Sequence, residues 1–207
     1  MNTSITTIIF DIGGVLITPS EKITPFILSE LFSLPLDLAI QEYTKALPKL
    51  RTGSSTVSLM IEDLKKRHVP VKNVSNLEQL YLELYQKQAV INEDVMRIVG
   101  VLHEKYTTVA FSNMIDLHVR CNEERQLFRH FHHVYLSSVT GLVKPEKAAF
   151  EHVLHDLGAV ATSCVFIDDK KENIDVARSL GFVTYLYDTD FQLKGFLQKD
   201  KINETSG

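Results

Sequence analysis

Short apolar runs that end in polar residues recur along the chain and predict buried β-strands. The first is Ile8-Ile9-Phe10, which ends at Asp11 and the turn pair Gly13-Gly14. Further runs occupy residues 107–111, 131–136, 165–167 and 183–186. Three of these end at Ser112-Asn113, Ser137-Ser138 and Asp168-Asp169. We therefore expect five strands, most of which deliver polar side chains at their carboxyl ends.

Segments with helical spacing lie between these runs, at residues 93–104, 116–128, 146–157 and 174–180. Strands that alternate with helices predict a parallel sheet covered on both faces. The predicted fold class is therefore α/β, with a Rossmann-like doubly wound parallel sheet as its core. In such sheets ligands bind outside the carboxyl ends of the strands, where the polar residues of this chain fall.

The alternation stops after the first strand, and helical patterns follow one another at residues 24–32, 36–47, 57–67 and 77–88. We predict that residues 18–88, called the cap segment below, form a helical cap domain inserted after the first strand. Residues 1–17 and 89–207 would then form the core. The polar stretch 199–207 is predicted to be a frayed tail.

Composition and charge narrow the classes of partner. Apolar residues make up 44% of the 207 residues and charged residues 23%, which is enough to bury a core. A formal net charge of −4 leaves no excess of Lys and Arg for non-specific electrostatic binding to nucleic acid or anionic lipid. Nothing is long and apolar enough to span a bilayer, and the two cysteines argue against a disulfide framework. We expect a cytoplasmic protein without nucleic-acid or membrane partners and predict no particular oligomeric state.

The candidate functional residues lie at or near the carboxyl ends of the predicted strands. The residues are Asp11, Ser112, Lys144, Asp168 and Asp169. Three carboxylates in one crevice repel one another unless a cation lies between them, and carboxylate oxygens suit Mg²⁺. Lys144 offers a positive charge for a phosphoryl group, and the Ser112 hydroxyl with nearby backbone N–H groups can bind its oxygens. The pattern therefore predicts a Mg²⁺ site that handles a phosphate ester.

With these residues in place, the chain resembles the haloacid dehalogenase (HAD) superfamily, specifically its phosphatase-like members with a small helical cap after the first strand. The resemblance covers nearly the whole chain. It rests on four motifs in order: Ile8-Ile9-Phe10-Asp11-Ile12-Gly13-Gly14-Val15-Leu16, then Phe111-Ser112-Asn113, then Gly141-Leu142-Val143-Lys144-Pro145-Glu146, and finally Val165-Phe166-Ile167-Asp168-Asp169 with Asn173 downstream.

The resemblance implies a Mg²⁺-dependent phosphatase for a small phosphorylated metabolite, such as a sugar phosphate. Asp11 would be the nucleophile that forms an aspartyl-phosphate, and Lys144 would stabilise the transition state. The implied metal ligands are Asp11, the backbone carbonyl of Gly13, Asp169, and Asp168 directly or through water. The phosphate-binding candidates are Ser112, Asn113 and, from the cap segment, Arg51.

Gly13 departs from the family pattern, in which an Asp at this position protonates the leaving oxygen and later activates water. Loss of a positioned general acid and base typically costs ~10² to 10⁴ in rate. Two other readings therefore stay open. One is a dehalogenase, which also uses a strand-end Asp nucleophile; the other is a binding or regulatory protein that kept the fold but lost turnover. Glu21 is the first alternative proton donor to consider.

Three further sequence features can be interpreted as either functional or structural. His130-Phe131-His132-His133 suggests zinc, although no nearby Cys or carboxylate completes a tetrahedral site. His118 either faces the site or packs as an ordinary histidine. Arg51 precedes the turn residue Gly53, and it either reaches an anionic substrate or stays solvated.

Overall fold

The computed structural model describes residues 4–18, 23–67 and 76–199. Its core is a five-stranded parallel sheet in the order β5-β4-β1-β6-β7. The strands are β1 (Thr7–Phe10), β4 (Thr107–Ser112), β5 (His133–Leu136), β6 (Cys164–Asp168) and β7 (Val183–Leu186). Each coincides with a predicted apolar run, and the predicted α/β, Rossmann-like fold class is confirmed.

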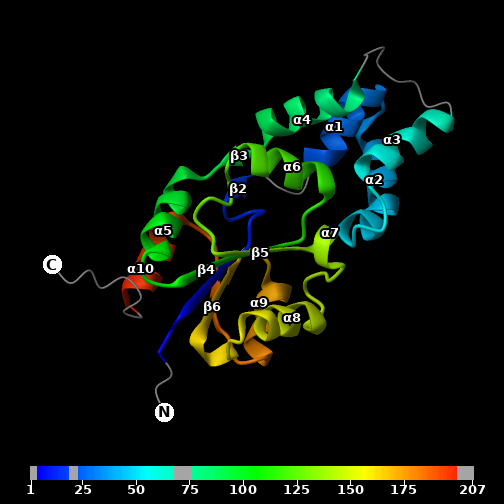
Figure 1. Ribbon diagram of the computed structural model, residues 1–207. Helices are drawn as coiled ribbons and strands as arrows, with labels where there is room; N and C mark the ends of the chain where they lie inside the picture. Colours follow the sequence, from blue (N-terminus) through cyan, green and yellow to red (C-terminus); the bar gives the residue numbers. More distant parts are fainter. Residues whose placement is uncertain (1–3, 19–22, 68–75, 200–207) are drawn as a thin grey trace.

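Helices cover both faces of this sheet (Figure 1). On one side lie α5 (Glu93–His103) and α10 (Asp190–Lys199), and on the other lie α8 (Lys147–Leu157) and α9 (Lys171–Ser179). The alternation of side chains along a strand decides which layer each residue joins. Ile8 and Phe10 share a buried cluster with Val99 of α5, whereas Ile9 shares the opposite cluster with Phe150 of α8. Burial of both faces explains why the strands are continuously apolar.

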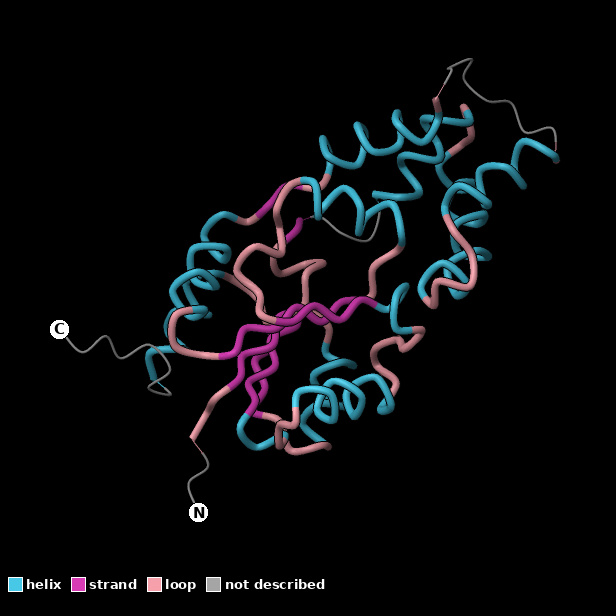
Figure 2. The backbone as a smooth tube through the Cα atoms, in the orientation of Figure 1, coloured by secondary structure: helices cyan, strands magenta, loops and turns pink. Residues whose placement is uncertain are grey.

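The cap segment leaves and rejoins the sheet through two short antiparallel strands, β2 (Ile17–Thr18) and β3 (Val90–Ile91). Between them lie α1 (Ile23–Phe32), α2 (Leu36–Arg51), α3 (Val57–Lys66) and α4 (Leu77–Gln88). Figure 2 shows these helices gathered beyond one end of the sheet, beside α6 (Asp116–Glu124). One buried hydrophobic cluster runs from β1 into α1 and α4. The predicted boundaries of a separate cap domain stay a prediction.

Several element ends differ from the sequence-based expectation. The helix expected to stop at residue 47 continues through Pro48 to Arg51, because proline removes only one N–H from the ladder and the Thr52 N–H bonds the Pro48 carbonyl. The expected strand 131–136 starts only at His133. The short helix α7 (Ser137–Thr140) and the helix α10 were not anticipated. The predicted frayed tail starts at Lys199, which is instead the last residue of α10, and residues 200–207 lie outside the described residues.

Among the described residues, no single helix has the length and apolar character needed to cross a membrane. Helices α1 and α2 meet that test only when taken together, and they are bent by 118° relative to each other.

Candidate active site

The register of the sheet places the strand-end residues side by side. Strand β1 lies between β4 and β6, with Phe10 opposite Ala110 on one side and Ile167 on the other. The Asp11 N–H continues this ladder by donating to the Ile167 carbonyl at 2.8 Å. Asp11 therefore emerges between the ends of β4 and β6, where Ser112 and Asp168 also lie.

Lys144 is the buried cation of this group. Its Nζ lies 2.9 Å from Oδ1 of Asp11 and 2.7 Å from Oδ2 of Asp168, and it donates to the Phe111 carbonyl at 2.7 Å. An ammonium has three N–H donors, so each has a protein acceptor. The Lys144 side chain is 1% exposed and that of Asp168 is 0% exposed. The ammonium is thus held in one place between two carboxylates.

Burial and charge shift the pKa values of this group. Burial raises the pKa of Asp11; Lys144 acts against that rise, and the nearby Asp168 carboxylate adds to it. Burial alone would lower the pKa of Lys144, but Asp11 and Asp168 outweigh it and raise the pKa of the ammonium. Lys144 therefore stays protonated at neutral pH, and it balances only part of the negative charge around it.

Asn113 holds the loop that carries Lys144. Its Oδ1 accepts from the Lys144 N–H at 2.9 Å, and its Nδ2 donates to the Lys144 carbonyl at 2.7 Å. Because the side-chain amide is occupied in this way, a contact from Asn113 to phosphate would come from its backbone N–H. Ser112 is buried at the end of β4 and lines the same cavity as Asp11, which agrees with its predicted place in the site.

Asp168 and Asp169 have different surroundings although they are adjacent. Asp168 Oδ1 accepts from the Lys170 N–H at 2.8 Å, and both of its oxygens accept from Nδ2 of Asn173, at 3.0 and 2.9 Å. With Lys144 included, Asp168 is fully engaged by protein groups. Asp169 Oδ1, by contrast, is buried and has no hydrogen-bond partner. A buried oxygen without a partner is costly unless something binds it.

The three carboxylates fit a divalent metal ion. One oxygen each of Asp11, Asp168 and Asp169 lies within 4.8 Å of the others, and this is the only such group of potential ligands in the part of the chain that the structure describes. Together with the partnerless Asp169 oxygen, this donor set suits a hard cation such as Mg²⁺. Burial, then Asp11 and Asp168, raise the pKa of Asp169 to about 6.

The absence of a side chain at Gly14 allows the Asp169 carboxylate to lie close to the backbone of the turn after β1. Its φ of +87° belongs to the left-handed region that favours glycine, and a Cβ atom at this position would lie 2.1 Å from Oδ2 of Asp169. The second glycine of the turn pair therefore has a steric reason. Gly13 lines the cavity beside Asp11, in the position from which its carbonyl is predicted to bind the metal.

A cavity of about 380 Å³ lies over Asp11 between the sheet and the cap segment. Arg51, from the last turn of α2, lines this cavity together with Ser112 and Lys144, so the structure brings the predicted cap cation to the same space as the strand-end residues. The turn after Arg51 packs tightly on the core, since a Cβ at Gly53 would lie 2.0 Å from the Ser138 carbonyl oxygen.

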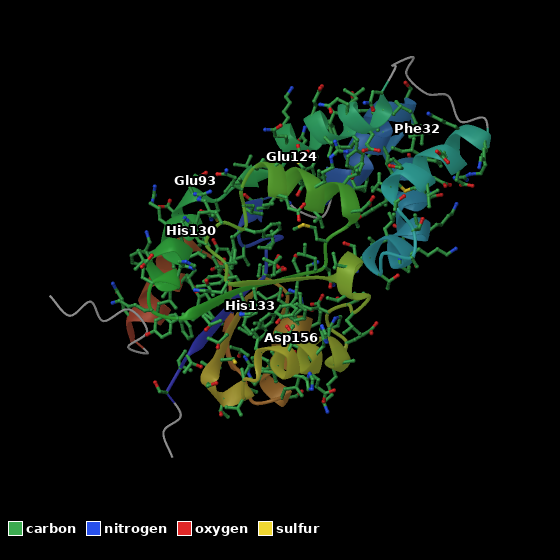
Figure 3. The ribbon with its side chains drawn as sticks, viewed as in Figure 1. Phe32, Glu93, Glu124, His130, His133 and Asp156 are labelled. Carbon is green, nitrogen blue, oxygen red and sulfur yellow. The ribbon has the colours of Figure 1, made fainter. Side chains whose placement is uncertain are left out.

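The histidines separate into two places. His118 is half-buried, lines the cavity and bonds Thr24 and Tyr81, so it faces the site and also packs against the cap segment. Figure 3 shows His130 beside α5 and His133 on β5. Neither contributes to the group of potential metal ligands found among the described residues, so the zinc hypothesis gains no support. Glu21 lies outside the described residues.

Sequence reasoning missed the cavity-lining residues Lys170, Tyr43 and Tyr85. Lys170 directly follows the Asp168-Asp169 pair, which was a usable signal. Tyr43 and Tyr85 come from α2 and α4, and nothing in a helical pattern shows which of its aromatic side chains faces a distant strand end.

The chain belongs to the haloacid dehalogenase-like hydrolases. The family model of that description matches residues 5–181, which include all of the strand-end residues described above. The family resemblance seen in the four motifs is therefore confirmed, and the protein is a hydrolase.

Two curated relatives differ in how much of the chain they match. The bifunctional epoxide hydrolase 2 of Rattus norvegicus is 26% identical over 196 residues, which are 86% of this chain and 35% of that protein. A phosphatase of Mycobacterium tuberculosis is 33% identical over 67 residues, which are 32% of this chain and 31% of that protein. The matched regions thus cover about a third of the length of each relative.

A solved structure supports the fold. A HAD family enzyme of Bacteroides thetaiotaomicron, in complex with magnesium and inorganic phosphate, superposes with a TM-score of 0.74 at 22% identity. The match covers 89% of this chain and 95% of that chain. At this level of identity the two proteins share a fold.

Asp169→Asn should weaken Mg²⁺ binding more than Asp168→Asn does. Both carboxylate oxygens of Asp168 accept hydrogen bonds, from Lys144, Lys170 and Asn173, whereas Asp169 has a buried oxygen without a partner. Loss of a supporting partner typically costs ~10- to 100-fold in metal affinity, and loss of a direct ligand should cost more. Calorimetric Mg²⁺ titrations of both variants, with circular dichroism as the folding control, test the order. Equal affinities would contradict it.

Mg²⁺ binding should weaken as the pH falls through about 6. The pKa of Asp169 is raised to about 6, so below that pH a proton occupies the carboxylate that the metal needs. The apparent dissociation constant should rise roughly tenfold per pH unit below this point and level off above it. Titrations at several pH values give the profile, and Asp169→Asn should flatten it. An affinity that does not change between about pH 5 and pH 7 would show that Asp169 is not a ligand.

Proposed function

We propose that the protein is a Mg²⁺-dependent phosphatase that hydrolyses small phosphate monoesters through an aspartyl-phosphate on Asp11. The observation that carries this proposal is the buried contact of Lys144 with Asp11 and Asp168, beside the partnerless carboxylate oxygen of Asp169. Asp11 and Lys144 line a cavity between the sheet and the cap segment, which suits chemistry on a bound ester rather than simple ion storage. The phosphatase among the relatives and the magnesium and phosphate bound to the Bacteroides enzyme add support.

In the first step, an oxygen of the Asp11 carboxylate forms a bond to phosphorus while the bond from phosphorus to the ester oxygen breaks. The electron pair of that bond leaves with the alcohol oxygen. In the second step, water attacks the aspartyl-phosphate, the bond between phosphorus and Asp11 breaks, and phosphate is released with the carboxylate restored. Asp11 thus begins and ends as the same anion.

The chain's own residues prepare both steps. Lys144 orients Asp11 through its 2.9 Å contact and presents a fixed positive charge beside the reacting carboxylate. Asn113 keeps the Lys144 loop in place, and Asn173 keeps Asp168 in place. Asp11, the Gly13 carbonyl and Asp169 would hold Mg²⁺, with Asp168 behind them. When bound, the metal supplies positive charge to the phosphoryl oxygens.

Gly13 restricts which esters react readily. Asp11 is the one carboxylic acid among the described residues that line the cavity, so no second acid there is placed to protonate the leaving oxygen. We therefore expect the leaving group to depart as an anion or to take its proton from water, unless a residue outside the described part of the chain, such as Glu21, donates it. The acidic pair Asp168 and Asp169 favours the phosphatase over a dehalogenase, because dehalogenation needs no metal site.

Asp11→Asn should abolish turnover while leaving the fold intact. The amide has almost the same volume as the carboxylate, but it is a far poorer nucleophile and a weaker metal ligand. The measurement is steady-state hydrolysis of p-nitrophenyl phosphate with Mg²⁺, with circular dichroism and urea unfolding as folding controls. A folded variant that keeps more than a few per cent of the wild-type rate would show that Asp11 is not the nucleophile.

Hydrolysis by the wild type should depend steeply on the pKa of the leaving group, with aryl and acyl phosphates far ahead of esters of ordinary alcohols. Gly13→Asp should flatten this dependence by supplying the missing acid, with a gain of ~10² to 10⁴ for poor leaving groups. The measurement is kcat/KM over a series of graded phosphate esters for both proteins. A flat wild-type profile would mean that another group supplies the proton, and Glu21 would be the first to replace.

A further inference from the structure

The cavity over Asp11 has two chemically different ends. The end formed by the strands carries charged and amide groups, including Lys144, Asn113 and Asn173. The end formed by the cap segment and α6 is lined mainly by aliphatic and aromatic side chains. Those that matter here are Ile23, Ile40, Leu47, Met114, Tyr85 and His118. A phosphate ester with its phosphoryl group at Asp11 would place the rest of the molecule against this second surface.

Three polar side chains at the cap end, those of His118, Tyr85 and Thr44, already have protein partners. His118 Nε2 lies 3.2 Å from Thr24 Oγ1 and 3.0 Å from the Tyr81 hydroxyl. The Tyr85 hydroxyl accepts from Asn122 at 3.0 Å. Thr44, which also lines the cavity, donates its hydroxyl to the Ile40 carbonyl at 2.7 Å. These side chains therefore present carbon and ring surfaces to the cavity more than hydrogen-bonding groups.

His118 adds a flat neutral surface and no charge. Its ring stacks on Tyr85 with the centroids 3.9 Å apart, and burial lowers its pKa to about 3, so it is uncharged throughout the neutral range. It offers no cation for a second anionic group on the substrate. Arg51 is the cation that α2 contributes to the cavity, at the last turn of that helix.

The side chains at the cap end favour some alcohol groups of a phosphate ester over others. The hydroxyl groups of a sugar would give up water at the cap end and meet side chains whose polar atoms are already paired, which is unfavourable. A hydrocarbon body would lose only its contact with water, and each buried methylene would strengthen binding about fourfold. The wall of the cavity thus favours an apolar body over a polyhydroxylated one.

We propose that the substrate is the phosphate monoester of an apolar alcohol, whose hydrocarbon body lies between α2, α4 and α6. This inference rests on the proposed phosphatase function for its reaction, but not for its binding site. It replaces the sugar phosphate that the family resemblance suggested as an example.

Binding of n-alkylphosphonates tests the site without turnover, because their carbon–phosphorus bond is not hydrolysed. In calorimetric titrations of the Mg²⁺-loaded protein, the dissociation constant should fall by up to about fourfold per methylene from methyl- to octylphosphonate until the cavity is filled. The phosphonate analogue of glucose 6-phosphate should bind no more tightly than methylphosphonate. A dissociation constant that is independent of chain length, or tighter binding of the sugar analogue, would overturn the inference.

Two substitutions on α2 form a matched pair. Ile40 and Leu38 are 39% and 42% exposed, yet only Ile40 of these two lines the cavity. Ile40→Gln should weaken octylphosphonate binding about fivefold to tenfold and leave methylphosphonate binding unchanged, as expected for one or two lost methylene contacts. Leu38→Gln should change neither. Equal effects of the two substitutions on octylphosphonate would overturn the inference.

Turnover of n-alkyl phosphates separates this inference from the proposed function. Their alcohols have nearly equal pKa values, so chain length varies while the leaving group stays chemically constant. Hydrolysis that becomes more efficient with chain length supports both. Chain-length-dependent binding without hydrolysis of either n-alkyl phosphates or p-nitrophenyl phosphate would support the hydrocarbon site and overturn the phosphatase. Hydrolysis with no dependence on chain length in either rate or binding would overturn the hydrocarbon site alone.

Discussion

The contact of one buried ammonium with two buried carboxylates organises this molecule. Lys144 cannot be buried alone, because desolvation of an unpaired charge is expensive, and Asp11 and Asp168 carry the same penalty without it. Removal of one partner from such a group typically costs ~3 to 5 kcal/mol. The strand register, the Asn113 contacts and the loop after α7 all serve to bring these three charges together. The same demand leaves negative charge in excess, which is what makes the site ready for a cation.

Asp168 and Asp169 are adjacent in the sequence, but their side chains have different hydrogen-bond partners. Asp168 is fully bonded by Lys144, Lys170 and Asn173, and it behaves as part of the scaffold. Asp169 approaches so close to Gly14 that no side chain fits there, and one of its oxygens is left without a partner. The division of roles therefore depends on the left-handed turn after β1 as much as on the acids themselves.

The two ends of the cavity have different chemical properties. In the proposed function the strand ends supply charge for a phosphoryl group, while the cap segment and α6 supply a surface on which Thr24, Tyr81 and His118 bond to one another. For the proposed reaction, the lack of an acid at position 13 favours phosphate esters whose leaving groups depart readily. The proposed reaction and the proposed choice of substrate thus depend on different segments of the chain.

The sequence by itself determined the parallel α/β core and the candidate strand-end residues, because short apolar runs such as Ile8-Ile9-Phe10 alternate with helical patterns, and most of these runs end in a polar side chain. Only the tertiary structure decided what those residues touch. The pairing of Asn113 with Lys144, the contact of Asp168 with Lys144, and the bond of His118 to Thr24 join residues that lie 24 to 94 positions apart in the sequence. Such contacts depend on strand register and helix packing, which a local pattern does not encode.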